Sequence, residues 1–136
     1  MIHIDIEYEG ELHCRASHGP SGTVIATDAP VDNNGRGESF SPTDLVATAL
    51  GACMATVMGI AAQRKNVPLV GMKVAVRKHM SADTPRRISM LELDLDVPLP
   101  PDHPERTFFE ATGRGCPVHH SLHPDIAVVM NWRWTG

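Results

Sequence analysis

SPTDLVATALGACMATVMGIAAQR, residues 41–64, is the stretch that decides the fold. Ser41 can cap a helix, Pro42 suits the first helical position, and Asp44 complements the helix dipole in the first turn. The stretch ends in an arginine followed by a lysine, and cations favour the C-terminal end of a helix before Pro68 forbids its continuation. The sequence therefore predicts one long helix that begins at Ser41 and ends near the arginine or lysine.

No charged residue occurs from Leu45 to Ala62, which is about the minimum length for a membrane span. The stretch is nevertheless mostly Ala, Gly and Thr, whose transfer into lipid gains little. A helix that is apolar on all sides can instead be a buried core helix. We therefore expect a core helix and no membrane partner. One face carries Val46, Ala49, Leu50, Cys53, Val57 and Ile60, and the small residues Gly51, Ala52, Ala55 and Gly59 permit close approach of other backbone.

Strands are predicted on both sides of this helix. Ile2, Ile4, Ile6 and Tyr8 alternate with polar residues, a period of two that is typical of a half-buried strand. Strands before the helix are expected over 2–8, 11–17 and 23–27, and strands after it over 72–80, 91–97 and 126–134, with short helices near 104–114 and 117–122. This order predicts an α+β fold. Because the chain has 136 residues, we expect one domain over 1–136.

Composition narrows the function classes. The net charge of −4 argues against a nucleic-acid partner, and the alternating first residues do not resemble a signal peptide. Three cysteines are too few and too odd in number for a secreted disulfide scaffold. A cytoplasmic protein with buried or functional thiols fits these observations.

Each cysteine can be interpreted either as a structural residue or as a reactive thiol. Cys53 on an apolar helix face can be a small core residue. Cys116 stands directly before Pro117 at a helix start, where unpaired backbone N–H groups stabilise a thiolate, although it can also be a cap that happens to be cysteine. Cys14 lies next to Arg15, but neighbours along a strand face opposite ways, so we favour a structural role for it.

Two segments together resemble the OsmC/Ohr family of osmotically inducible and organic hydroperoxide resistance proteins. The first is GESFSPTDLVATALGACMATVMGIAA, a small-residue helix opened by Ser-Pro with a cysteine about three turns in. The second is GCPVHHSL, some sixty residues later, in which a cysteine precedes Pro-Val. The resemblance covers nearly the whole chain, from HGPSG onward.

The resemblance implies an intertwined homodimer in which antiparallel sheets wrap around a long central helix, with sites at the subunit interface. It implies a thiol-dependent peroxidase that reduces organic hydroperoxides, and hydrogen peroxide as a further substrate, in oxidative-stress defence. Cys53 would attack the peroxide, Cys116 would resolve the product, and a dithiol would regenerate the pair. Arg15 is the candidate for the family's arginine, which holds the thiolate. No cofactor is implied. The apolar pocket would be lined by Val46, Leu50, Val57, His119 and His120.

One position departs from the hydroperoxide-resistance branch. That branch carries a glutamate ten positions before the helix cysteine, where it orients the arginine, but this chain has Thr43. Asp44 points about 100° further round the helix, and Glu38 lies upstream in the loop. These are the candidate orienting carboxylates. The departure keeps open a second hypothesis, a small-molecule binding protein with little or no peroxidase turnover.

A third hypothesis is metal binding, because Cys116, His119, His120 and His123 lie close together in the sequence. Pro124 cuts the helix directly after His123, and no second Cys/His cluster completes a closed site. We therefore expect no metal. A Ser–His hydrolase is weaker still, because the sequence has no G-x-S-x-G turn.

Overall fold

The computed structural model describes residues 1–136, and the chain divides into two compact units, residues 1–46 and 47–136. Each is described by itself. The two units hold one three-stranded sheet each, which together with the helices gives the mixed α+β class expected from the sequence. The single domain over 1–136 stays a prediction.

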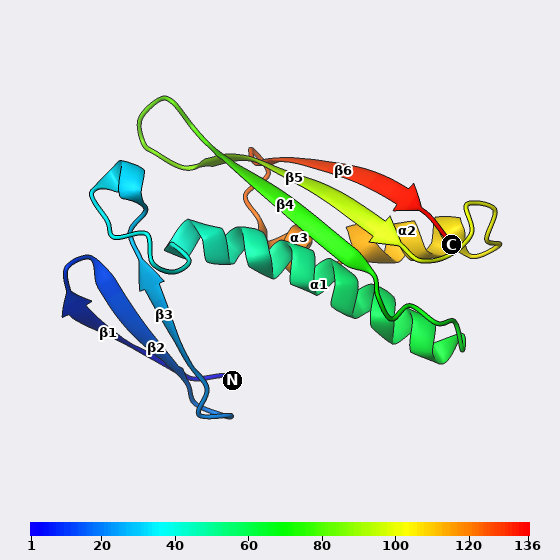
Figure 1. Ribbon diagram of the computed structural model, residues 1–136, viewed down its shortest axis with the longest axis horizontal. Helices are drawn as coiled ribbons and strands as arrows, with labels where there is room; N and C mark the ends of the chain where they lie inside the picture. Colours follow the sequence, from blue (N-terminus) through cyan, green and yellow to red (C-terminus); the bar gives the residue numbers. More distant parts are fainter. The chain divides into compact units, whose positions relative to one another are not determined.

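The first unit is an antiparallel sheet in the order β1-β2-β3 (Figure 1). Its elements are β1 (Ile4–Gly10), β2 (His13–His18), β3 (Val24–Asp28) and the short 3-10 helix η1 (Val31–Asn33). Cys14 pairs with Tyr8 and Thr27, whereas Arg15 pairs with Glu7 and Ala26. Because side chains alternate along a strand, Cys14 and Arg15 face opposite sides of this sheet.

The helix α1 (Pro42–Arg64) begins where the sequence predicts. Its start is a reciprocal cap, because the Asp44 N–H donates to Ser41 Oγ at 3.1 Å and the Ser41 N–H donates to Asp44 Oδ2 at 2.9 Å. The helix ends at Arg64, as the sequence predicts, and Asn66 just beyond it has a left-handed φ of 54°.

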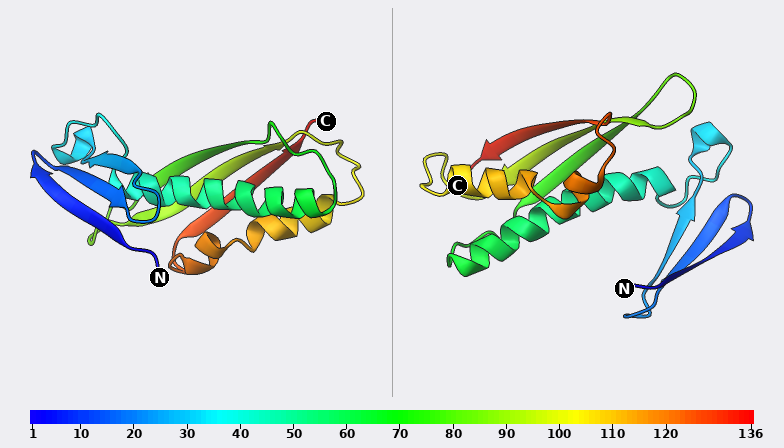
Figure 2. Two further views of the ribbon diagram at one scale, coloured as in Figure 1. Left: turned by 90° about the horizontal axis from the view of Figure 1, so that it is seen from below. Right: turned by 180° about the vertical axis from the view of Figure 1, so that it is seen from behind.

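The second unit is a sheet in the order β4-β5-β6, with α1, α2 and α3 on one face of it (Figures 1 and 2). Its further elements are β4 (Lys73–Met80), β5 (Ile88–Val97), α2 (Arg106–Arg114), α3 (Pro117–Ser121) and β6 (Ala127–Trp134). β4 and β5 are antiparallel, but β5 and β6 run parallel. The expectation of purely antiparallel sheets was therefore wrong. Parallel neighbours need a crossover, and α2 and α3 form it.

The core of the second unit lies between α1 and β5. Leu50, Met54 and Met58 on α1 are fully buried, as are Leu91, Leu93, Leu95 and Val97 on β5. Gly51 allows the close approach expected of it, since a Cβ there would lie 2.9 Å from Val76 Cγ2. Gly59 differs, because no heavy atom of the chain lies within 4 Å of the position its Cβ would take.

Part of α1 remains uncovered within the chain. By length and mean hydropathy α1 could cross a membrane, but core helices of soluble proteins meet the same criterion, and this one packs on a sheet. Only 39% of its most apolar window is buried. The exposed positions Ala49, Ala52, Thr56 and Ile60 form one stripe of the helix.

Candidate functional site

Cys53 lies about three turns into α1, on the flank of the face that packs on the sheet. It is partly exposed and packs against the cluster formed by Leu50, Met54 and the buried leucines of β5. The helix places it there because positions 50, 53, 54 and 57 share one side at a spacing of three to four residues. An apolar helix flank thus presents one thiol at the boundary of the core.

Cys116 is the N-cap of α3, as the Cys-Pro pair predicts. Its backbone is extended (φ −66°, ψ 149°), Pro117 takes the first helical position, and the thiol sulfur accepts the His119 N–H at 3.4 Å. The Cys116 side chain is fully buried. Burial raises the pKa of the Cys116 thiol above its usual value, and backbone N–H groups of His119 and Val118 partly oppose that rise.

The structure brings the two thiols together. Cys116 is in hydrogen-bonding contact with Cys53, and this neighbour also raises the pKa of Cys116, because two adjacent sulfurs resist carrying two negative charges. Neither cysteine is in a disulfide. Burial and this neighbour together favour the neutral thiol at Cys116. Two thiols in contact are also close enough to form a disulfide after a small rearrangement.

The side chains around the pair are mostly apolar. Leu50 is fully buried and Val57 is half-buried, whereas Val46 lies seven positions before Cys53 on α1, at the end of the first unit; their place as pocket-lining residues stays a prediction. The sequence prediction missed Val118 and Leu122, which pack on the same cluster as both cysteines. Their spacing of four on the short helix would have indicated a shared face.

The two histidines expected at the rim differ in their environment. His119 is half-buried, and its Nδ1 contacts the Arg114 carbonyl oxygen at 2.5 Å, so that Nδ1–H donates and Nε2 is left as an acceptor. This bond ties α3 to the end of α2 and helps to fix Cys116 between them. His120 is exposed, with its ring 6.3 Å from that of His119.

Arg15 lies on β2 in the first unit, and its approach to Cys53 stays a prediction. Its side chain is exposed, and Glu7 is its cross-strand partner on β1. Such a pair can interact electrostatically.

The two candidate orienting carboxylates lie together before and at the start of α1. Glu38 and Asp44 line a cavity of about 420 Å³ with Gly37, Ser39 and Phe40. The Asp44 carboxylate is used in the helix cap described above, whereas Glu38 is an exposed loop residue. The segment that carries Glu38 is tied to β3, because the Asp28 N–H donates to the Phe40 carbonyl oxygen at 3.1 Å.

The histidines that suggested metal binding are not assembled into a site. No three His, Cys, Asp or Glu side chains lie in metal-ligating geometry. His123, at the end of this group, instead lies 3.8 Å from the carboxylate of Asp125.

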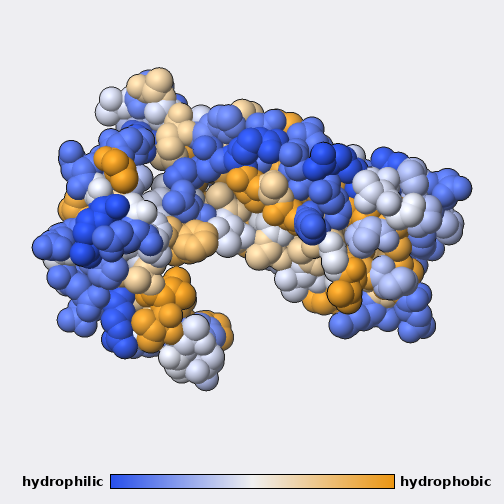
Figure 3. Space-filling model, viewed as in Figure 1, coloured by the Kyte–Doolittle hydropathy of each residue, from blue (hydrophilic) through white to orange (hydrophobic).

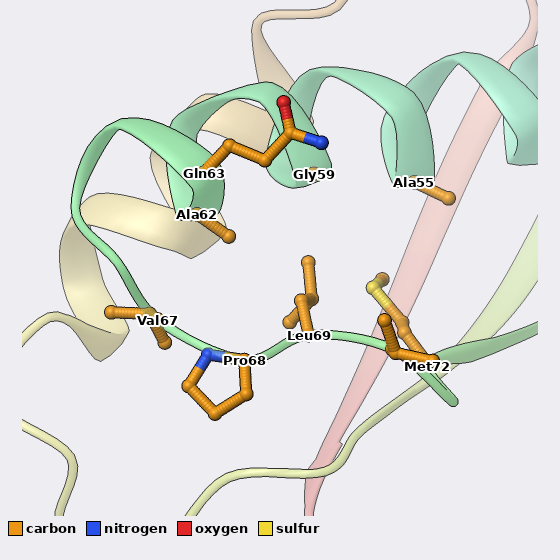
Figure 4. A pocket seen from close by; sticks show the side chains of 9 residues that line it. Ala55, Gly59, Ala62, Gln63, Val67, Pro68, Leu69 and Met72 are labelled. Atoms are coloured by element: carbon orange, nitrogen blue, oxygen red, sulfur yellow. The ribbon is translucent and has the colours of Figure 1, made fainter.

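A second cavity, of about 360 Å³, lies at the other end of α1 and was not expected from the sequence (Figure 4). Ala62 on α1 and Leu69 on the following segment face each other across it, and no charged residue lines it. Ala55 lies about 200° round the helix from Cys53, so this cavity is on another side of α1 from the thiol pair.

Comparison of the sequence and the structure with known proteins shows the family to which the chain belongs. The family model of OsmC-like protein matches residues 35–131, which include both cysteines of the pair. The chain belongs to the OsmC-like protein family. It is similar to a candidate osmotic stress induced and detoxification response protein of Psychrobacter arcticus 273-4, with 41% identity, a TM-score of 0.92, and coverage of 98% of this chain and 96% of that one.

More distant members share the fold. The OsmC-like protein of Mycoplasma pneumoniae is 16% identical with a TM-score of 0.82, covering 100% of this chain and 98% of that one. The organic hydroperoxide resistance protein OsmC of Legionella pneumophila is 12% identical with a TM-score of 0.78, covering 98% and 96%. No curated protein matches the sequence of this OsmC-like protein.

Proposed function

We propose that this OsmC-like protein is a thiol-dependent peroxidase that reduces organic hydroperoxides, and hydrogen peroxide as a further substrate, in oxidative-stress defence. The observation that carries the proposal is the contact between two free thiols of unequal burial in an apolar cluster. The partly exposed Cys53 can meet a substrate. The buried Cys116 is positioned to meet only Cys53.

The chemistry follows from this geometry. The Cys53 thiolate attacks the distal peroxide oxygen, the O–O bond breaks, and an alcohol or water leaves after taking a proton. Cys53 is then a sulfenic acid. The Cys116 sulfur attacks it, water leaves, and a Cys53–Cys116 disulfide forms, which prevents overoxidation. An external dithiol returns both cysteines to thiols. The free thiols suit a reducing compartment such as the cytoplasm.

Arg15 is our candidate for the cation that holds the Cys53 thiolate. Glu38 is the better candidate to orient it, because the Asp44 carboxylate already caps α1. Arg15→Ala should lower the rate of peroxide consumption and Arg15→Lys should restore part of it. An Arg15→Ala variant as fast as the wild type would remove Arg15 from the mechanism.

A homodimer is the proposed assembly. Apolar side chains reach the surface in both units (Figure 3): Ile4, Ile6 and Tyr8 on β1 are 54%, 69% and 63% exposed, and Ile60 on α1 is 46% exposed. A second copy that intertwines with the first would cover these surfaces and make α1 a central helix. A stable monomer in sedimentation at micromolar concentration would contradict this.

The test of the function is peroxide consumption with a dithiol, comparing cumene hydroperoxide with hydrogen peroxide. Cys53→Ser should abolish consumption. Cys116→Ser should consume about one equivalent and stall with an oxidised Cys53, as mass spectrometry would show. Cys14→Ser is the control and should leave turnover intact. If no variant differs from a free thiol in its rate of oxidation, the peroxidase proposal fails.

One observation favours a second function, that of a small-molecule binding protein with little turnover. Thr43 stands where the family's glutamate would be, and the carboxylate of Asp44 is engaged in the helix cap. If the peroxidase assay fails, binding of an apolar ligand, followed by tryptophan fluorescence, tests this alternative.

A further inference from the structure

The two sulfurs of the thiol pair differ in access from outside. Cys116 is fully buried and belongs to the core cluster with Leu50, Met54 and the β5 leucines, whereas Cys53 is partly exposed at the edge of that cluster. The covering of Cys116 comes from the second unit itself. Adding a second subunit can only reduce access further, so it cannot uncover Cys116.

We propose that the external thiol which reduces the Cys53–Cys116 disulfide attacks the sulfur of Cys53, so that Cys116 is always the leaving group. The proposal rests on the disulfide of the proposed function and specifies where the reductant forms its bond. Thiol–disulfide exchange needs the attacking thiolate to reach one sulfur directly, and access decides which sulfur is attacked. An attack on Cys116 would have to pass through packed core side chains.

The exchange balances as follows. The reductant thiolate forms a bond to Cys53 Sγ, the Cys53–Cys116 bond breaks, and Cys116 leaves as a thiolate that takes up one proton. The backbone N–H of His119 faces the departing sulfur, and that of Val118 also donates to it. These donors stabilise the thiolate as it forms. They offset the slower departure expected of a thiol whose pKa burial has raised.

The mixed disulfide on Cys53 has two possible fates. A dithiol reductant uses its second thiol to attack its own bound sulfur, which releases Cys53 and carries two electrons away as a cyclic disulfide. A monothiol cannot do this. The Cys116 thiol, in contact with Cys53, then expels the monothiol and restores the protein disulfide, because the internal thiol acts at high effective concentration. Attack at Cys53 is therefore consistent with the dithiol reductant of the proposed function.

The experiment uses the full chain carrying Cys14→Ser, so that only the thiol pair can react. The disulfide is formed with diamide, which makes the test independent of peroxidase activity. The oxidised protein is treated with 2-mercaptoethanol, quenched in acid, unfolded, alkylated and mapped by mass spectrometry. Most of the protein should return to the disulfide, but in the fraction that the acid quench traps with bound 2-mercaptoethanol we expect the adduct on Cys53 and the alkyl group on Cys116. The reverse pattern, or failure of diamide to form the disulfide, would overturn the proposal.

A second measurement does not depend on the disulfide. In the Cys14→Ser background, Cys116→Ser leaves Cys53 as the single cysteine, and Cys53→Ser leaves Cys116. With 5,5′-dithiobis(2-nitrobenzoate), the first protein should react at least about tenfold faster than the second when folded, and at a similar rate in urea. Equal rates in the folded proteins would overturn the proposal. If the adduct maps to Cys53 but peroxide forms no disulfide, the proposed function fails and this inference stands.

Discussion

Gly51→Ala should destabilise the protein, because the α1 helix can approach β4 only where it has no side chain. An added Cβ would lie 2.9 Å from Val76 Cγ2 and 3.3 Å from Val74 Cγ1. Valine is stiff at χ1, so neither side chain can turn away easily. Overpacking of this kind costs about 1–3 kcal/mol, and the alanine regains about 1 kcal/mol of helix propensity. The net loss should be about 1 kcal/mol.

Gly59→Ala is the matched control, since it lies in the same helix and its Cβ would meet nothing within 4 Å. Both variants gain the same helix propensity, so the difference between them isolates the packing cost of about 1–3 kcal/mol. Urea unfolding followed by tryptophan fluorescence measures both, at two protein concentrations so that any effect of Gly59→Ala on association is visible. If Gly51→Ala is as stable as Gly59→Ala, the reasoning from close packing is refuted.

Three further predictions concern α2, the thiol pair and the outer face of the sheet. Gly113→Ala should destabilise the chain by about 1 kcal/mol and alter the near-ultraviolet circular dichroism, because its Cβ would lie 3.0 Å from the Trp132 ring. Burial raises the pKa of Cys116, so the unfolded chain loses this proton first and stability falls as pH rises above about 8.5. Cys116→Ser should reduce that fall between pH 8 and 10 in chemical denaturation, and an unchanged slope would count against it. Arg77 lowers the pKa of Asp94, whose stabilisation is present above the unfolded pKa of about 4 and is lost as pH falls below it. Asp94→Asn should therefore lose less Tm than the wild type between pH 5 and pH 3.

The start of α1 could be predicted because it depends on four consecutive residues. The hydroxyl of Ser41 and the carboxylate of Asp44 satisfy each other's backbone N–H groups, and no distant part of the chain is needed. The end was predicted near Arg64 or Lys65, from the terminal cations and from Pro68, and the helix does end at Arg64. The sequence did not indicate how the chain turns there: Asn66 adopts a left-handed conformation, which asparagine tolerates.

The direction of β6 could not be predicted from its pattern. Ile126, Val128 and Met130 identify an apolar face, but a period of two is the same for parallel and antiparallel neighbours. The direction depends on the end of the sheet at which α2 and α3, which connect β5 to β6, deliver the start of β6. That is a matter of how two short helices pack, and composition alone does not determine it.

The position of Cys116 as a helix cap could be predicted from the Cys-Pro pair, but the burial of its side chain could not. A cysteine before proline at a helix start would be accessible in a surface helix, where the same N–H donors would favour a reactive thiolate. Here the leucines of β5 and the apolar face of α1 cover it, and burial raises its pKa instead. Which of two cysteines is buried is a long-range property, and the roles proposed for Cys53 and Cys116 depend on it.

The same reasoning separates the two carboxylates near the start of α1. A side chain that orients an arginine must be able to point at it without loss elsewhere. If the Asp44 carboxylate left the Ser41 N–H, the helix cap would be lost at a cost of about 1 kcal/mol. Glu38 lies in an exposed loop whose backbone is already tied to β3 through the Asp28–Phe40 hydrogen bond, so its side chain can move while the loop stays in place. With Thr43 in place of the family's glutamate, we therefore propose that the orienting carboxylate, if this chain has one, is Glu38 in the loop before the helix and not Asp44 within it.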